Sequence, residues 1–570
     1  MDIKEQANFI WSIADLLRGN FKQSEYGKVI LPFTVLRRFD CVLAPSKEEI
    51  LERNKSLAVS NKAPIFKKYT GHDYYNVSKF DFEKLIDDSN NIDTNLKDYI
   101  NGFSDDVKEI LDNFEIVTII EKLKKAGLLY LVVQKFSEIN LGADTIDNLE
   151  MGYMFEELIR KFSEQSNETA GEHFTPREVI ELMVEVLLDT NLDEITTTDG
   201  KVITILDPAC GTGGMLSIAQ NKIRALNSTT TVIPFGQELN PETYATCKSD
   251  MILKNNTNSK IVFGNSFSED GFREQKFDYI LSNPPFGVEW KKVKNFIENE
   301  SKHKGYDGRF GAGTPRISDG SLLFLQHMIS KMQPIEKGGS RIGIVFNGSP
   351  LFTGDAGSGE SEIRKWIIEK DLLEAVIGLP DQLFYNTGIS TYVWILTNRK
   401  TDRRKGKIRL INGTSYFKKM RKSLGNKRNE ITESDRKEIV RLYSTYEHDE
   451  NYIDFDNDDF GYRKITIERP LYDENREVVV EKGNPKPNSK LRDTETVPFK
   501  EDIHEYFKRE VLPHVPDAWI DEKKTKIGYE IPFTRHFYKF TPLRESSVIL
   551  DEIKQLEEKI QKSLNELFKG

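Results

Sequence analysis

The fold of this chain is organised around Asn283-Pro284-Pro285-Phe286, which directly follows the apolar run Phe277-Asp278-Tyr279-Ile280-Leu281-Ser282. The apolar run predicts a short buried strand. Two prolines cannot continue the hydrogen-bond ladder of a sheet, and the residue before a proline is held in extended geometry. Asn283 is therefore expected at the carboxyl end of a strand, where open α/β sheets bind their ligands.

The residues after this strand suit one kind of chemistry. The side-chain oxygen of Asn283 and the carbonyl of Pro284 are two acceptors that can hold both hydrogens of an aromatic amine and so favour a tetrahedral, nucleophilic nitrogen. Phe286 offers a ring on which a base taken out of a helix can stack. The same letters also fit a strand-ending turn with one buried phenylalanine, so the upstream residues decide between the two interpretations.

Three earlier strands end in residues that fit a nucleotide site. Val202–Leu206 leads into Asp207-Pro208-Ala209-Cys210-Gly211-Thr212-Gly213-Gly214 and then a helix, and glycines let a backbone approach its ligand closely. Leu216 stands where a dinucleotide fingerprint has its third glycine, so that fingerprint is absent. Glu238 ends the next strand, where an acid that binds a ribose diol belongs. Asn265-Ser266 follows the third strand and is placed to face an adenine ring. The four strand ends together are far more specific than any one of them.

A capped helix is expected just before the first of these strands. A helix over about 147–163 leads into Gly171-Glu172-His173-Phe174-Thr175-Pro176-Arg177-Glu178. Pro176 suits the first position of the next helix, with Thr175 as its N-cap. Such a helix start exposes backbone N–H groups and a partial positive charge that suit a carboxylate. Taken alone, an ordinary capped helix with a structural His173 explains these residues equally well.

Composition limits what the whole chain can be. At 570 residues and 38% hydrophobic content it should fold into two or three globular domains. It has 91 acidic and 81 basic residues, a net charge of -10, which argues against a free-standing duplex binder but not against a subunit whose partner makes most of the DNA contacts. Neither a signal peptide nor a membrane-length apolar run is visible. Cys41, Cys210 and Cys247 show no ligand or disulfide spacing, which indicates a reducing cytoplasm.

These motifs resemble those of a known family, the modification (M) subunits of type I restriction–modification systems, which are N6-adenine DNA methyltransferases. Residues 207–214 match the family's cofactor loop and residues 283–286 its catalytic tetrapeptide, while residues 171–176 resemble the segment that closes over the methionine end of the cofactor. Further likeness lies in 31–38, 460–470 and 528–533. The resemblance implies the catalytic residues Asn283, Pro284, Pro285 and Phe286. It implies S-adenosylmethionine as cofactor, bound by Gly171, Glu172, His173, Phe174, Thr175, Pro176, Asp207, Gly211, Thr212, Gly213, Gly214, Glu238, Asn265 and Ser266.

We therefore expect an α/β fold, a seven-stranded Rossmann-like class I methyltransferase core with a helical N-terminal domain and a partly helical C-terminal region. The expected boundaries are 1–140, 141–415 and 416–570. The chemistry would be direct attack of the adenine amine on the sulfonium methyl, without a metal. Expected partners are double-stranded DNA, a specificity (S) subunit, a restriction (R) subunit and a second M subunit. Alternatives are methylation of RNA or of a protein glutamine, and a non-catalytic assembly subunit, against which the intact residues 283–286 argue.

Other segments allow two interpretations each. The glycine-rich stretch 287–320 is either a loop that closes on DNA or a disordered surface loop. Phe384 and Tyr385, between two strands expected to form an antiparallel pair, are either contacts for the extruded base or core aromatics. The basic runs 399–405 and 418–422 suit phosphate contacts or a solvated strand edge.

The last helix, 545–568, is predicted to dock a specificity partner. Its apolar residues Ile549, Ile553, Leu556 and Ile560 follow spacings close to a heptad seam, and charged residues cover the other faces. Packing on the chain's own domain is the alternative.

Overall fold

The computed structural model describes residues 3–166, 175–254, 258–385, 387–537 and 545–567. The chain divides into two compact units, Met1–Ile531 and Pro532–Gly570. Within the described residues, no helix combines the length and apolarity needed to cross a membrane.

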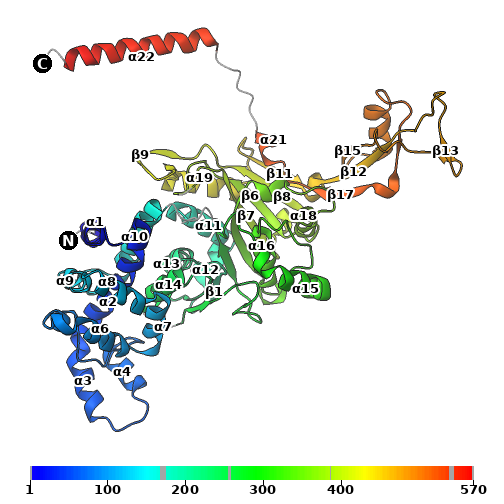
Figure 1. Ribbon diagram of the computed structural model, residues 1–570. Helices are drawn as coiled ribbons and strands as arrows, with labels where there is room; N and C mark the ends of the chain where they lie inside the picture. Colours follow the sequence, from blue (N-terminus) through cyan, green and yellow to red (C-terminus); the bar gives the residue numbers. More distant parts are fainter. Residues whose placement is uncertain (1–2, 167–174, 255–257, 386, 538–544, 568–570) are drawn as a thin grey trace. The chain divides into compact units, whose positions relative to one another are not determined.

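The first part of the large unit is helical, as expected (Figure 1). Its core is built from apolar faces at helical spacing, and the buried Arg38 donates hydrogen bonds to the carbonyls of Leu141 (2.5 Å) and Ile146 (2.8 Å), which ties the helices to the chain that follows. The helices are α1 (Ile3–Leu17), α2 (Tyr26–Leu43), α3 (Lys47–Ser56), α4 (Ala63–Thr70), α5 (Phe82–Ile86), α6 (Ile92–Asn101), α7 (Asp105–Asn113), α8 (Ile116–Lys125) and α9 (Leu129–Ser137).

A mixed sheet forms the centre of the unit. Its order is β11-β8-β6-β7-β5-β4-β1-β2-β3, where β1 to β5 run parallel to one another and β7 lies antiparallel between β5 and β6. The strands are β1 (Val202–Asp207), β2 (Thr231–Glu238), β3 (Lys260–Phe263), β4 (Tyr279–Ser282), β5 (Arg341–Asn347), β6 (Leu373–Gly378), β7 (Thr391–Thr397), β8 (Lys407–Asn412) and β11 (Tyr452–Asp456). The four strands before the predicted site residues are therefore parallel, so their carboxyl ends meet at one edge.

The expected seven-stranded core is present, but two strands extend it. β8 pairs parallel with β6, and β11 pairs antiparallel with β8, so the described sheet has nine strands. The sheet thus continues past residue 415, where a boundary was expected; the division at 140 and 415 stays a prediction.

Helices cover both faces of the sheet (Figure 1). One core lies between the sheet and helices α11 (Arg177–Asp189), α13 (Gly214–Leu226), α14 (Pro241–Leu253) and α19 (Glu433–Ser444). The helices α16 (Ser321–Ser330) and α18 (Gly359–Glu369) lie on the other side in Figure 1. α10 (Asn148–Ser166) precedes α11, and α12 (Leu192–Thr197) precedes β1.

The stretch 287–320 is not the open loop that its glycines suggested. It contains α15 (Lys294–Lys304), and Trp290, Ile297 and Phe310 are buried with Phe267 and Leu323 in a small core of their own. The glycines serve the turns around these aromatic and aliphatic anchors, which is why the segment is ordered.

After the main sheet, the large unit ends in a second sheet. Its strands are β12 (Gly461–Glu468), β15 (Asp493–Pro498), β16 (Trp519–Ile520) and β17 (Lys526–Tyr529), and buried Arg364 of α18 donates to the carbonyl of Tyr529 (2.6 Å). The unit Pro532–Gly570 contains α21 (Phe533–Phe537) and α22 (Ser546–Leu567). The helix predicted over 545–568 is thus confirmed.

Candidate active site

Asn283 leaves the carboxyl end of β4 and is held by a residue far away in the chain. Its Nδ2 donates a hydrogen bond of 2.8 Å to Oγ1 of Thr175. Thr175 is not the N-cap of α11, as its sequence context suggested. Pro176 takes that place, because its ψ of 141° is extended and its carbonyl accepts from the N–H groups of Val179 and Ile180. The Thr175 hydroxyl therefore accepts a hydrogen bond from Asn283 instead of capping the helix. This bond fixes the positions of Nδ2 and Oδ1 in the Asn283 amide.

The rest of the tetrapeptide is more buried than an open base-binding surface would be. Pro284 is buried and Pro285 half-buried. The ring of Phe286 is 6% exposed and packs in the core that includes α11. Little of this side chain is exposed to a stacked base, so its stacking role stays a prediction.

Gly211 and Gly213 adopt left-handed backbone conformations for different reasons. Gly211 has φ +53° with no atom within 4 Å of the position where a Cβ would lie, so the space beside it is open. Gly213 has φ +83° and caps α13, and a Cβ there would lie 2.7 Å from Sγ of Cys247. Gly211 therefore leaves open space beside the backbone, and its contact with a ligand stays a prediction, whereas packing requires Gly213. Thr212 and Gly214 between and after them are half-buried.

Asp207 connects the glycine loop to the strand that carries Asn283. Its Oδ1 accepts from Oγ of Ser282 (2.9 Å) and from the N–H of Ala209 (3.0 Å). Burial, with a smaller contribution from the negative charge of Glu238, raises the pKa of Asp207 to about 7, although the two hydrogen bonds act to lower it. A carboxyl group with this pKa is ready to ionise when a positive charge arrives.

Glu238, at the end of β2, holds the loop from the other side. Its Oε2 accepts from the N–H of Gly211 (2.8 Å) and its Oε1 from the N–H of Asn240 (2.7 Å). Each carboxylate oxygen has a second lone pair, so the same group that shapes the loop can also accept from a diol.

Asn265 and Ser266 use their side chains mainly to build the turn after β3. Oδ1 of Asn265 accepts from the N–H groups of Phe267 and Ser268, and Oγ of Ser266 donates to the carbonyl of Pro208 at 2.5 Å. Ser266 thus fastens this turn to the glycine loop. A direct contact of either side chain with a ligand stays a prediction.

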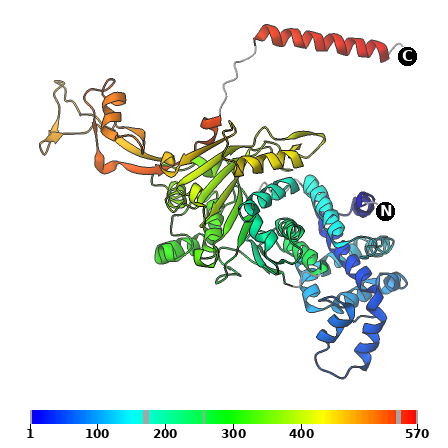
Figure 2. The same cartoon turned by 180° about the vertical axis from the view of Figure 1, so that it is seen from behind.

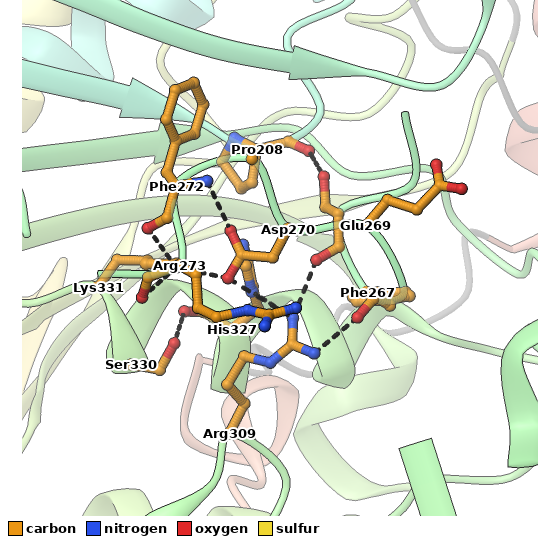
Figure 3. Close-up of polar contacts among 12 residues, drawn as sticks. Pro208, Phe267, Glu269, Asp270, Phe272, Arg273, Arg309, His327, Ser330 and Lys331 are labelled. Carbon is orange, nitrogen blue, oxygen red and sulfur yellow. Dashed lines mark hydrogen bonds and ion pairs between the residues drawn. The ribbon is translucent and has the colours of Figure 1, made fainter. Parts of the chain in front are cut away.

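A buried polar cluster supports this turn from below (Figure 3). Arg309 donates to the carbonyls of Ser266 (2.9 Å) and Phe267 (2.6 Å) and pairs with Glu300 at 2.7 Å. Nη1 of Arg309 lies 3.2 Å from Nδ1 of His327, whose pKa burial lowers to about 3, with the charges of Arg309 and Lys331 adding to the effect. His327 is therefore neutral and can accept from the guanidinium.

Some predicted residues are not tested by this geometry. Gly171, Glu172, His173 and Phe174 lie outside the described residues. Phe384 is 1% exposed and belongs to the core, while Tyr385 is half-buried. Sequence reasoning missed Ser282 and Arg309. Ser282 directly precedes Asn283 on a predicted strand, but no local signal pairs Arg309 with a turn 43 positions earlier.

Comparison with known proteins shows the family of the chain. The N-6 DNA Methylase family matches residues 147–460, and the HsdM N-terminal domain matches residues 6–136. The chain is 27% identical over 487 residues to the type I restriction enzyme MjaIX methylase subunit of Methanocaldococcus jannaschii, covering 81% of this chain and 80% of that protein. It is 32% identical over 279 residues to the HindI methylase subunit of Haemophilus influenzae, covering 48% of this chain and 55% of that protein.

A solved structure has the same fold. The type I restriction-modification system methyltransferase subunit from Streptococcus thermophilus superposes with a TM-score of 0.64 at 22% identity, over 81% of this chain and 97% of that chain.

Proposed function

Because the chain belongs to the N-6 DNA methylase family, as a methyltransferase subunit of the type I restriction–modification class, we propose that it transfers the methyl group of S-adenosylmethionine to N6 of adenine in double-stranded DNA. The observation that carries this proposal is the position of Asn283. It stands at the end of β4, beside the glycine loop to which Ser282 and Asp207 connect it, with its amide turned by Thr175.

The loop residues fit the proposed cofactor. Glu238 supplies a carboxylate for a ribose diol, the open space beside Gly211 admits a close ligand, and Asp207 supplies a buried carboxyl that can neutralise a positive charge. S-adenosylmethionine, when bound, supplies the methyl group. Residues 171–176 are proposed to complete this site, together with Thr212, Gly213, Gly214, Asn265 and Ser266.

Catalysis by the chain itself rests on positioning. Thr175 holds the amide of Asn283 so that its oxygen, with the carbonyl of Pro284, can accept the two amine hydrogens of adenine and disperse the positive charge that develops on nitrogen. The tightly packed Pro284 and Phe286 keep these acceptors from moving. The proton that N6 must lose on gaining the methyl group would leave along the hydrogen bond to the oxygen of Asn283 and pass to water, and no covalent enzyme intermediate is required.

The test is methyl transfer from tritiated S-adenosylmethionine to bacterial genomic DNA, followed by digestion to nucleosides. Radioactivity in N6-methyladenine is the expected result; label in another nucleoside, in RNA or in protein only would contradict the proposal. Asn283→Ala should abolish transfer and change cofactor affinity by only a few-fold, because removed catalytic hydrogen-bonding groups of this kind cost ~3–4 kcal/mol.

We also propose that α22 docks a specificity subunit. Within the unit Pro532–Gly570 its seam residues Ile549, Ile553, Leu556 and Ile560 are between 42% and 59% exposed, which is unusual for four large aliphatic side chains in register on one helix face. A heptad-like seam fits a partner helix better than it fits solvent. A restriction subunit and a second copy of this chain are proposed as the remaining members of the complex, by relation to the type I enzymes.

A further inference from the structure

The two basic runs of the sequence, 399–405 and 418–422, lie in different environments in the structure. In the first run, Lys400 is buried and pairs with Asp371 at 2.6 Å, and Arg404 is buried over the ring of Tyr443. Both cations serve the fold. The second run lies on strand β9 (Lys418–Leu424), which pairs antiparallel with β10 (Lys427–Glu430) and is exposed along most of its length. The exposed cations of the first run have partners of their own, since Arg403 lies over the ring of Tyr446 and Lys405 pairs with Asp402.

This hairpin concentrates positive charge in an acidic protein. Residues 418–430 contain six lysines and arginines and one glutamate, although the whole chain has a net charge of -10. In Figures 1 and 2 the strand β9 projects as an arm from the sheet. The described residues provide no ion-pair partner for its exposed cations Lys418, Lys419, Arg421, Lys422 and Arg428. Unpaired exposed cations at this density favour a polyanionic ligand.

The base of the hairpin contains a hollow with the donors that a phosphate needs. The hollow has a volume of about 550 Å³ and is lined by Lys419, Arg428, Ser423, Asn429, Gln382 and Met420. Gln382 holds a left-handed φ of +53°, and the N–H groups of Arg428 (2.9 Å) and Asn429 (3.2 Å) donate to its carbonyl. Backbone strain of this kind persists where the surrounding structure holds it in place, often at binding sites.

The hairpin is anchored to the helix end that orients Asn283. Lys427, unlike its neighbours, is buried; its Nζ forms an ion pair with Glu178 and donates to the carbonyl of Leu383 at 3.1 Å. Glu178 lies in the first turn of α11, three positions after Thr175, which accepts the hydrogen bond from Asn283. The start of α11 therefore contacts both the β9–β10 hairpin, through Glu178, and Asn283, through the preceding Thr175.

We propose that the β9–β10 hairpin binds the DNA backbone and that its hollow seats a phosphate of the strand whose adenine reaches Asn283. The inference rests on the proposed function and adds a DNA contact made by this chain itself. An acidic protein partner is the alternative ligand. The hairpin contacts the start of α11, next to the Thr175 that binds Asn283, and this position favours DNA.

The experiment compares two quadruple variants of the full chain, purified with the partner chains that accompany it. The hairpin variant carries Lys418→Gln, Lys419→Gln, Arg421→Gln and Lys422→Gln. The matched control carries Arg476→Gln, Lys482→Gln, Lys486→Gln and Lys490→Gln, which remove four exposed cations around a second two-stranded hairpin, β13 (Val480–Glu481) and β14 (Asn484–Pro485). The readouts are kcat/KM for methyl transfer to sheared genomic DNA over a series of KCl concentrations, and cofactor affinity by calorimetry.

Successive side chains of a strand point to opposite faces, so we expect about two of the four replaced cations to contact phosphates. Each phosphate contact contributes about 0.9 to the slope of log affinity against log salt. The hairpin variant should thus lose about 2 from this slope and about 30-fold in kcat/KM at 0.15 M salt, with cofactor affinity unchanged. Lys419→Gln with Arg428→Gln, which targets the hollow, should reproduce about half of the change in slope.

The outcomes separate this proposal from the proposed function. If wild-type protein does not methylate DNA, the proposed function fails and this inference fails with it. If wild-type protein methylates DNA and the slopes of wild type, hairpin variant and control coincide, only the hairpin proposal is overturned. Loss of a co-purifying protein from the hairpin variant with an unchanged salt slope would also overturn it, in favour of an acidic protein partner.

Discussion

Asp207→Asn tests whether the buried carboxyl between the glycine loop and β4 is held ready for a positive charge. Burial raises the pKa of Asp207 from 3.8 to about 7. The folded protein therefore binds a proton at this site over a range in which the unfolded chain has released it. The stability that this proton provides is complete below about pH 4 and is lost as pH rises through 7.

The magnitude follows from the size of the shift. Each pKa unit corresponds to about 1.4 kcal/mol, so between pH 5 and pH 8.5, where the group is fully ionised, the wild-type protein should lose ~3 kcal/mol of folding free energy through this group. Asparagine keeps the acceptor for Ser282 and Ala209 but does not ionise. It also buries an NH₂ group that costs ~1–3 kcal/mol if unpaired. The variant should therefore be less stable than wild type at pH 5. Between pH 5 and pH 8.5 its unfolding free energy should rise by ~3 kcal/mol relative to that of wild type.

Thermal unfolding without ligand at pH 5 and pH 8.5 measures this change, with the exposed Asp493→Asn as a control for the loss of one surface charge. The Tm of Asp207→Asn minus the Tm of wild type should be negative at pH 5 and should be higher by several degrees, or positive, at pH 8.5. A constant difference would refute the proton linkage. Wild-type affinity for S-adenosylmethionine should also rise with pH through about 7, and that of Asp207→Asn should be weaker and flat.

Five further substitutions test the rest of the site, and one truncation tests α22. Thr175→Val removes the hydrogen bond to Asn283 and should lower kcat roughly fivefold, the equivalent of about 1 kcal/mol, with cofactor affinity unchanged by calorimetry; an unaltered kcat would mean that the bond does not orient the amide. Glu238→Ala leaves the N–H groups of Gly211 and Asn240 without their acceptor, and Gly213→Val forces a side chain against Cys247; each should weaken cofactor binding, the first by ~1–3 kcal/mol, and normal affinity in both would place the cofactor elsewhere. Arg309→Met should raise KM for the cofactor more than it lowers kcat, and Arg309→Lys should recover part of the loss; equal effects on both parameters would indicate general damage to the fold. Truncation after Arg544 should spare cofactor binding and abolish co-purification with a specificity partner, and a truncated chain that still assembles and methylates its site would make α22 merely structural.

The sequence alone determined the parts of the fold that depend on local signals. Short apolar runs ended by glycine, proline or asparagine located the strands before Asp207, Glu238, Asn265 and Asn283, because such residues interrupt a ladder wherever they stand. The same strand-ending residues placed the glycine loop 207–214 and residues 283–286 at one sheet edge, since parallel strands share their carboxyl ends.

Only the tertiary structure decided what these residues contact. Thr175 looks like a helix cap in the sequence, yet its hydroxyl accepts from Asn283 across 108 positions. The basic runs 399–405 and 418–422 are alike in composition, but the cations Lys400 and Arg404 of the first are buried with partners while the second is exposed on a hairpin. Contacts between distant segments depend on how whole helices and strands pack, and a window of neighbouring residues carries no information about the partner on the other side of that packing.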